Sequence, residues 1–135
     1  MAVFGRLGRY TDVGLLVMRI GLGAMMVTHG YPKVAGGTEK WMKIGKAMEN
    51  LGVHSYYTWW GAAASFTECV GGILIVLGLF FRPVSLLMMF TMFVAALSHI
   101  KGGDSLGDAS HAIELCFVFL GLIFVGPGKY SVDKS

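Results

Sequence analysis

Four long apolar runs dominate this sequence, at about residues 13–31, 57–81, 84–100 and 109–126. A helix needs about 20 residues to cross the hydrocarbon core of a bilayer, and each run is close to that length. Apolar residues make up 55% of the chain and the mean hydropathy is +0.65, both above the values of soluble domains. We therefore predict an all-α integral membrane protein, a four-helix bundle of up-down topology that forms one domain over residues 1–135.

Three connections join the predicted spans, and only the first is long. Residues 38–52 carry apolar side chains at helical spacing and lysines on the other faces, which predicts a short amphipathic helix at the membrane interface. Arg82 and Pro83 are expected to form a very short turn between the second and third spans. The glycine-rich segment 101–108 is interpreted as a plain, flexible loop.

Charge and cysteine content exclude several classes of protein. The net charge of +3 comes from scattered Lys and Arg without a basic tract, so nucleic acid is not an expected partner. Each side of the membrane is expected to carry five positive residues, so charge alone does not orient the chain. They are Arg6, Arg9, Arg82, Lys129 and Lys134 on the side of the termini, and Lys33, Lys40, Lys43, Lys46 and Lys101 on the other. Cys69 and Cys116 lie within apolar runs and are interpreted as small buried hydrophobes. No removable signal peptide is expected.

Several ionisable residues occur within the spans or at their edges, where charged side chains are costly and usually turn inward. They are Arg19, His29, Lys33, Glu68, His99, His111 and Glu114. At about 1.5 Å per residue, the two glutamates lie roughly 18–20 Å, and the three histidines roughly 22–24 Å, from the side that carries both termini. These five groups should therefore share one layer. Arg19 lies at roughly 9 Å on the same scale, and we expect it to pair with Glu68 or Glu114.

This layer predicts a polar ligand-binding or proton-handling site walled by apolar side chains. The candidate catalytic groups are Glu68, Glu114 and His99, and the candidate ligand-binding groups are Arg19, His29, Lys33 and His111. The structural alternative is that Arg19 and one glutamate fix the helix register and that nothing reacts.

Metal and haem are not expected as cofactors. His111 and Glu114 share one helix face, but the repeated Glu-x-x-His pattern of di-metal bundles is absent. For haem, the histidines lie near the ends of the spans and the chain has no CxxCH motif.

Three local motifs resemble those of one family of small membrane proteins, the DoxX family. The first span has Arg19, then Gly23, then the segment HGYPK at residues 29–33. The second has Glu68 followed by a glycine pair, with LGL and an arginine further on, and the chain closes with GPGKYSVD at residues 126–133. The likeness covers essentially the whole chain, and the closing motif is its most specific part.

This resemblance implies a multi-pass protein of the bacterial or archaeal cytoplasmic membrane with both termini in the cytoplasm. It also implies the membrane subunit of a quinone-linked oxidoreductase, which works with a soluble or membrane redox partner subunit. Whether the chain also forms a homo-oligomer is left open. One alternative is a non-catalytic scaffold that docks a partner through residues 38–52. A weaker alternative is a small transporter or proton path, because buried charged groups also mark conduction pathways.

Overall fold

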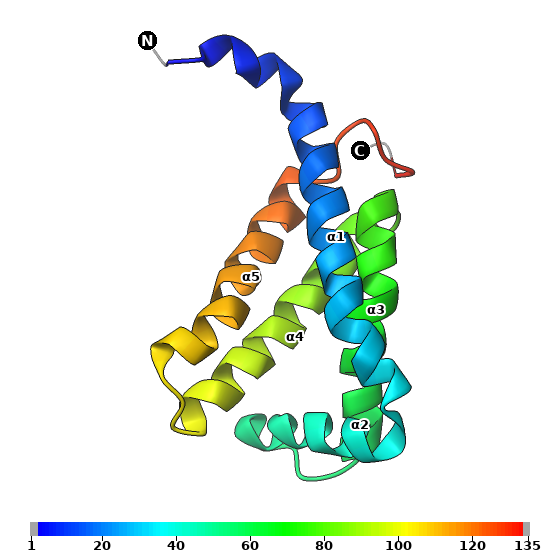
Figure 1. Cartoon of the computed structure of the whole chain (residues 1–135), viewed down its shortest axis with the longest axis vertical. Coiled ribbons are helices and arrows are strands. Elements are labelled where there is room, and N and C mark those ends of the chain that lie inside the picture. The colour runs from blue at the N-terminus through cyan, green and yellow to red at the C-terminus, as the bar shows by residue number, and fades with distance from the viewer. Residues whose placement is uncertain (1–2, 134–135) are drawn as a thin grey trace.

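The computed structural model describes residues 3–133, and every regular element within that range is a helix (Figure 1). In chain order the elements are η1 (Gly5–Tyr10), α1 (Thr11–Ala35), α2 (Gly37–Gly45), η2 (Lys46–Leu51), α3 (Tyr57–Leu77), α4 (Phe81–Lys101) and α5 (Leu106–Val125). Lys134, one of the five positive residues on the side of the termini, lies outside the described residues.

Within residues 3–133, four helical segments are long and apolar enough to cross a membrane: the run from η1 through α1, and then α3, α4 and α5. The predicted fold class is therefore confirmed. Both chain ends lie at one end of the bundle, and α2 lies across the opposite end (Figure 1). The short helix predicted over residues 38–52 is present as α2 followed by η2, with a change from α to 3-10 geometry at Lys46.

The turn between α3 and α4 differs from the prediction. α3 ends at Leu77 because Gly78 adopts the left-handed conformation, with φ of 67°, which favours glycine and closes a helix. Residues 78–80 form the turn. Arg82 and Pro83, expected to form the turn itself, belong to the first turn of α4. That position suits proline, as the sequence predicts, because no N–H is needed there.

Two other helix ends extend beyond the predicted bounds. α5 begins at Leu106, where the hydroxyl oxygen of Ser105 accepts a hydrogen bond from the N–H of Asp108 at 3.2 Å and so caps the helix. α1 continues past Pro32 to Ala35, although proline cannot donate a backbone hydrogen bond inside a helix.

Glycines allow α1 and α3 to approach closely. A Cβ at Gly23 would lie 2.5 Å from the carbonyl oxygen of Gly72, and a Cβ at Gly30 would overlap the backbone of Cys69. Small residues are the usual means of helix association in lipid, because close backbones maximise van der Waals contact. This packing fixes which residues of α1 face α3 near the end occupied by α2.

Among the four long helices, two pairs pack along their length, and a smaller contact joins the two pairs. α1 packs along α3, α4 packs along α5, and α3 contacts α4. Within the described residues, no Cα of α1 comes within 8 Å of a Cα of α5. The fourth side of the bundle, between α1 and α5, is therefore open.

Residues 126–133, which we name the C-terminal clasp, fold back over the end of the bundle that carries the termini (Figure 1). The guanidinium of Arg19, which is 1% exposed, donates to the carbonyl oxygens of Pro127 and Tyr130. Arg19 therefore pairs with backbone carbonyls. The predicted pair with Glu68 or Glu114 is wrong.

The same clasp also caps a helix. The Asp133 carboxylate accepts hydrogen bonds from the N–H groups of Phe80 and Phe81, at 3.0 and 2.8 Å. The first N–H groups of a helix have no partner within the helix, and a carboxylate there satisfies them and complements the helix dipole. The closing motif of the sequence thus ties the turn between α3 and α4 to α1.

Replacing Arg19 should reveal the contribution of the clasp. In the Arg19→Met variant the carbonyls of Pro127 and Tyr130 lose their donor. We expect destabilisation by about 2–4 kcal/mol, from roughly 1–3 kcal/mol per buried unsatisfied group. Unfolding in detergent followed by circular dichroism measures this loss. Arg9→Met, at an exposed position of η1, is the matched control, and superimposable curves for the two variants would refute the role of Arg19.

Candidate functional site

An ion pair joins α1 and α3 near the end of the bundle that α2 covers. Lys33 Nζ donates to both carboxylate oxygens of Glu68, at 2.9 and 2.8 Å. The Glu68 side chain is 4% exposed and that of Lys33 is 33% exposed. The close approach at Gly30 brings the two residues together, because Gly30 packs on the backbone of Glu68 and Cys69. A two-oxygen contact of this kind holds the carboxylate in one orientation.

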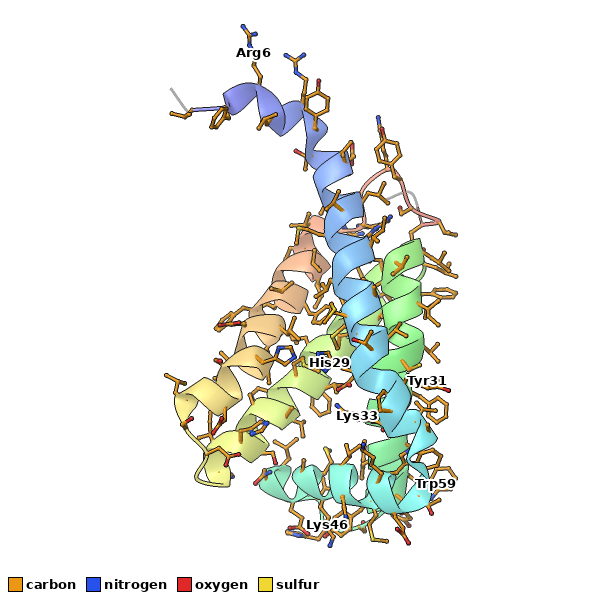
Figure 2. All side chains as sticks on the ribbon, in the orientation of Figure 1. Arg6, His29, Tyr31, Lys33, Lys46 and Trp59 are labelled. Atoms are coloured by element: carbon orange, nitrogen blue, oxygen red, sulfur yellow. The ribbon has the colours of Figure 1, made fainter. Side chains whose placement is uncertain are left out.

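A cavity of about 140 Å³, which we name the polar chamber, adjoins this pair. Five of the predicted site residues line it: His29, Lys33, Glu68, His99 and His111. Met26 and Met92, both buried, supply part of its apolar wall. Figure 2 shows His29 and Lys33 on the side of α1 that faces α4, whereas Tyr31 points away from the bundle. α1, α3, α4 and α5 thus contribute to one polar space.

A larger and mainly apolar cavity opens beside the chamber, bounded by α2 and η2, α3 and α4. It has a volume of about 390 Å³, and we name it the α3/α4 cleft. Its walls include Met48, Trp60, Ala64, Phe90 and Val94. The cleft and the polar chamber share the side chains of Lys33, Glu68 and His99. The ion pair and this histidine therefore lie where an apolar space meets a polar one.

His99 is oriented by a partner from the loop between α4 and α5. Its Nδ1 lies 2.8 Å from Asp104 Oδ2, and both side chains are about half exposed. A carboxylate on one ring nitrogen fixes the tautomer and leaves the other nitrogen able to exchange a proton. The sequence prediction of a plain loop missed this contact. An acidic residue five positions after a histidine at a helix end was the available signal.

A third cavity, of about 440 Å³, occupies the open side of the bundle and is named the α1/α5 groove. Methionines of α1 line it, among them Met18 and Met25. His29 and His111 lie at its polar end, with their ring centroids 5.0 Å apart. Both histidines also line the polar chamber, so the chamber lies between the groove and the α3/α4 cleft and shares lining residues with each.

Two predicted site residues lie elsewhere. Arg19 is held by the C-terminal clasp, and 14 residues separate it from Lys33, roughly 21 Å along α1. Glu114 is exposed and lines none of these three cavities. It lies about 200° around the helix from Ala112, which is buried in the core, and it therefore faces outward.

Comparison with known proteins agrees with this architecture. The profile of the DoxX family matches residues 14–100. The inner membrane protein YphA of Escherichia coli K12 is 32% identical, over 93% of this chain and 96% of its own. The inner membrane protein YqjF of the same strain is 30% identical, over 91% of this chain and 92% of its own. No solved structure matches the chain. These relatives and the four apolar helices support a multi-pass inner-membrane protein.

A double-mutant cycle should measure the strength of the Lys33–Glu68 pair. Glu68→Gln removes the charge that compensates Lys33, and we expect it to lower the free energy of unfolding by about 2–3 kcal/mol. This is slightly below the usual cost of breaking a buried pair, because the Lys33 side chain is 33% exposed. Lys33→Met combined with Glu68→Gln should cost less than the sum of the single changes, by about 1–2 kcal/mol. Denaturant unfolding in detergent gives these values.

The matched control for this cycle is Glu39→Gln on the exposed surface of α2. It should change stability by less than about 0.5 kcal/mol. Strict additivity of the Lys33 and Glu68 changes would show that the two charges do not stabilise each other.

Proposed function

This chain belongs to the DoxX family, and we propose that it binds a quinone in the α3/α4 cleft, with the quinone ring at the boundary with the polar chamber, as the membrane subunit of an oxidoreductase. One observation carries the proposal: the Lys33–Glu68 pair and His99 lie at the inner boundary of an apolar cleft of about 390 Å³. Ligand sites are typically apolar cavities of about 300–1,000 Å³ with a few converging polar groups.

The two kinds of surface fit the two parts of a quinone. The carbonyl oxygens of its ring accept hydrogen bonds, and Lys33 and His99 are donors at the boundary of the cleft. The ring and its isoprenoid tail are apolar, like the walls formed by Trp60, Ala64 and Phe90. Trp60 and Phe90 also offer aromatic faces against which a flat ring stacks.

The polar residues have separate roles in this proposal. Reduction of a quinone to a quinol takes up two electrons and two protons. His99, held by Asp104, and Glu68 relay these protons from water to the ring oxygens. Glu68, a carboxylate in its pair with Lys33, takes up a proton before it passes that proton on. Lys33 compensates the negative charge that develops on the ring oxygens. A soluble or membrane partner subunit supplies the electrons. Glu114, which is exposed outside the three cavities, has no part in this chemistry.

The orientation of the chain is a further part of the proposal. Both ends of the chain lie at one end of the bundle (Figure 1), and we assign that end to the cytoplasm, as the family resemblance implies. The polar chamber, the α3/α4 cleft and α2 then lie near the opposite surface of the membrane. A quinone diffusing in the bilayer can reach the cleft from the side, without crossing water.

Blocking the cleft should abolish quinone binding. In Ala64→Phe a ring fills part of the cleft, and we expect binding of a water-soluble quinone analogue to weaken by at least about tenfold, which corresponds to 1.4 kcal/mol. Quenching of tryptophan fluorescence in lipid nanodiscs measures it, because Trp60 lines the cleft. Ala24→Phe, on the exposed surface of α1, should bind like the wild type. Equal affinities in both variants would argue against the cleft as the site.

Protein purified from its own membranes should carry quinone. We expect the ultraviolet absorption of the wild type to change on reduction with borohydride, as quinone becomes quinol. The Ala64→Phe variant should show little of this change, and Ala24→Phe should keep it. A flat difference spectrum for the wild type, together with no binding of the analogue, would favour the partner-docking scaffold.

A further inference from the structure

Ionisable side chains are exposed at membrane depth along the α1/α5 groove and on the adjoining outer surface of α5. His29, His111 and Glu114 are all exposed in the single chain. Glu114 is the ninth of the 20 residues of α5, so it lies near the middle of that span. Ionisable groups at this depth are costly against lipid, and they are normally turned inward or paired. The surface that carries them is therefore expected to be covered in the membrane.

The same surface has the shape of an unfilled helix interface. The α1/α5 groove separates two helices whose Cα atoms, among the described residues, nowhere come within 8 Å of each other, on the open side of the bundle. Gly21 at the rim of the groove and Gly121 on α5 have nothing within 4 Å of the position of a Cβ. Exposed glycines on membrane helices let the backbone of another helix approach closely.

We propose that this surface pairs with the same surface of a second copy of the chain, which forms a two-fold homodimer. The pairing surface comprises His29 and Gly21 of α1 and His111, Glu114 and Gly121 of α5. A two-fold axis along the membrane normal keeps both copies at one depth. Glu114 of one protomer then lies near the level of His111 and His29 of its partner, because His111 and Glu114 are one helical turn apart.

Charge complementarity identifies a second copy as the occupant. An isologous interface must complement itself, and this surface offers an acid and two potential donors on each protomer. Glu114 of each protomer accepts a hydrogen bond from a histidine of the other, so the exposed carboxylate on each α5 gains a donor. An acyl chain would fill the groove but would leave Glu114 without a donor. The side chains of Phe117 and Phe124, 68% and 78% exposed, supply apolar contact beside the polar pairs.

The dimer also closes the polar chamber. His29 and His111 line the chamber and are exposed on the open side of the bundle. A second copy on that side covers both rings, so that the chamber no longer opens toward lipid there. Access from the bilayer is then left to the α3/α4 cleft on the other side.

Counting protomers in liposomes tests the dimer directly. Single-molecule photobleaching of singly labelled, full-length protein should show mainly two-step bleaching for the wild type, with the dimer fraction falling as lipid is added. Glu114→Ala and His111→Ala should each weaken association roughly threefold to tenfold, as expected for the loss of an interhelical hydrogen bond. The exchange variant that combines His111→Glu with Glu114→His should restore association to within about threefold of the wild type.

Disulfide cross-linking locates the interface. In a background with Cys69→Ala and Cys116→Ala, Phe117→Cys on α5 should give a cross-linked dimer in membranes. Ile73→Cys, at an exposed position on α3, is the matched control and should stay monomeric.

Each of three results would overturn the proposal. They are single-step bleaching of the wild type at every lipid ratio, unchanged association in Glu114→Ala, and purification from native membranes with a different membrane protein in place of a second copy.

Discussion

The hydrocarbon core of a bilayer offers no hydrogen-bond partner, and the buried charges of this protein follow from that constraint. The guanidinium of Arg19 donates through its two terminal nitrogens to carbonyls of the C-terminal clasp at one end of the bundle. The ammonium of Lys33 is satisfied by Glu68 near the other end. Between these polar contacts, α1 and α3 are held by close glycine packing at Gly23 and Gly72. Polar pairs thus fix the register of helices whose apolar surfaces alone would allow sliding.

The polar chamber gains its character from its position between two apolar spaces. The α3/α4 cleft meets it at Lys33, Glu68 and His99, and the α1/α5 groove meets it at His29 and His111. In the function that we propose, a lipid-soluble molecule and a proton reach the same place by different routes, the first from the bilayer and the second by way of His99 and Asp104. A quinone site requires access for both the quinone and the protons. Pairing with a second copy leaves the α3/α4 cleft as the opening through which the quinone enters.

Hydropathy was enough to predict the number of spans and the fold class, because apolar runs of this length have few other stable folds. The depth of each residue along its helix also predicted that five ionisable residues share one layer. Depth does not give the rotation of a helix, and for that reason Glu114 was wrongly grouped with Glu68. The partners of Arg19 could not be predicted, because they are backbone carbonyls of a segment 108 residues away in the case of Pro127. The left-handed conformation of Gly78 was not predicted either, and it places the α3–α4 connection at residues 78–80, before Arg82 and Pro83.

The distance along the chain between Arg19 and its acceptors has a consequence for biogenesis. Translation proceeds from the N-terminus, so Arg19 enters the bilayer before α3, α4 and α5 and long before the carbonyls of Pro127 and Tyr130 exist. Until the last residues of the clasp leave the ribosome, the guanidinium lacks its native partners and the N-terminus of α4 lacks its Asp133 cap. Closure of this end of the bundle therefore waits for the synthesis of residues 126–133, and a chain that lacks them leaves the charge of Arg19 without its carbonyl acceptors.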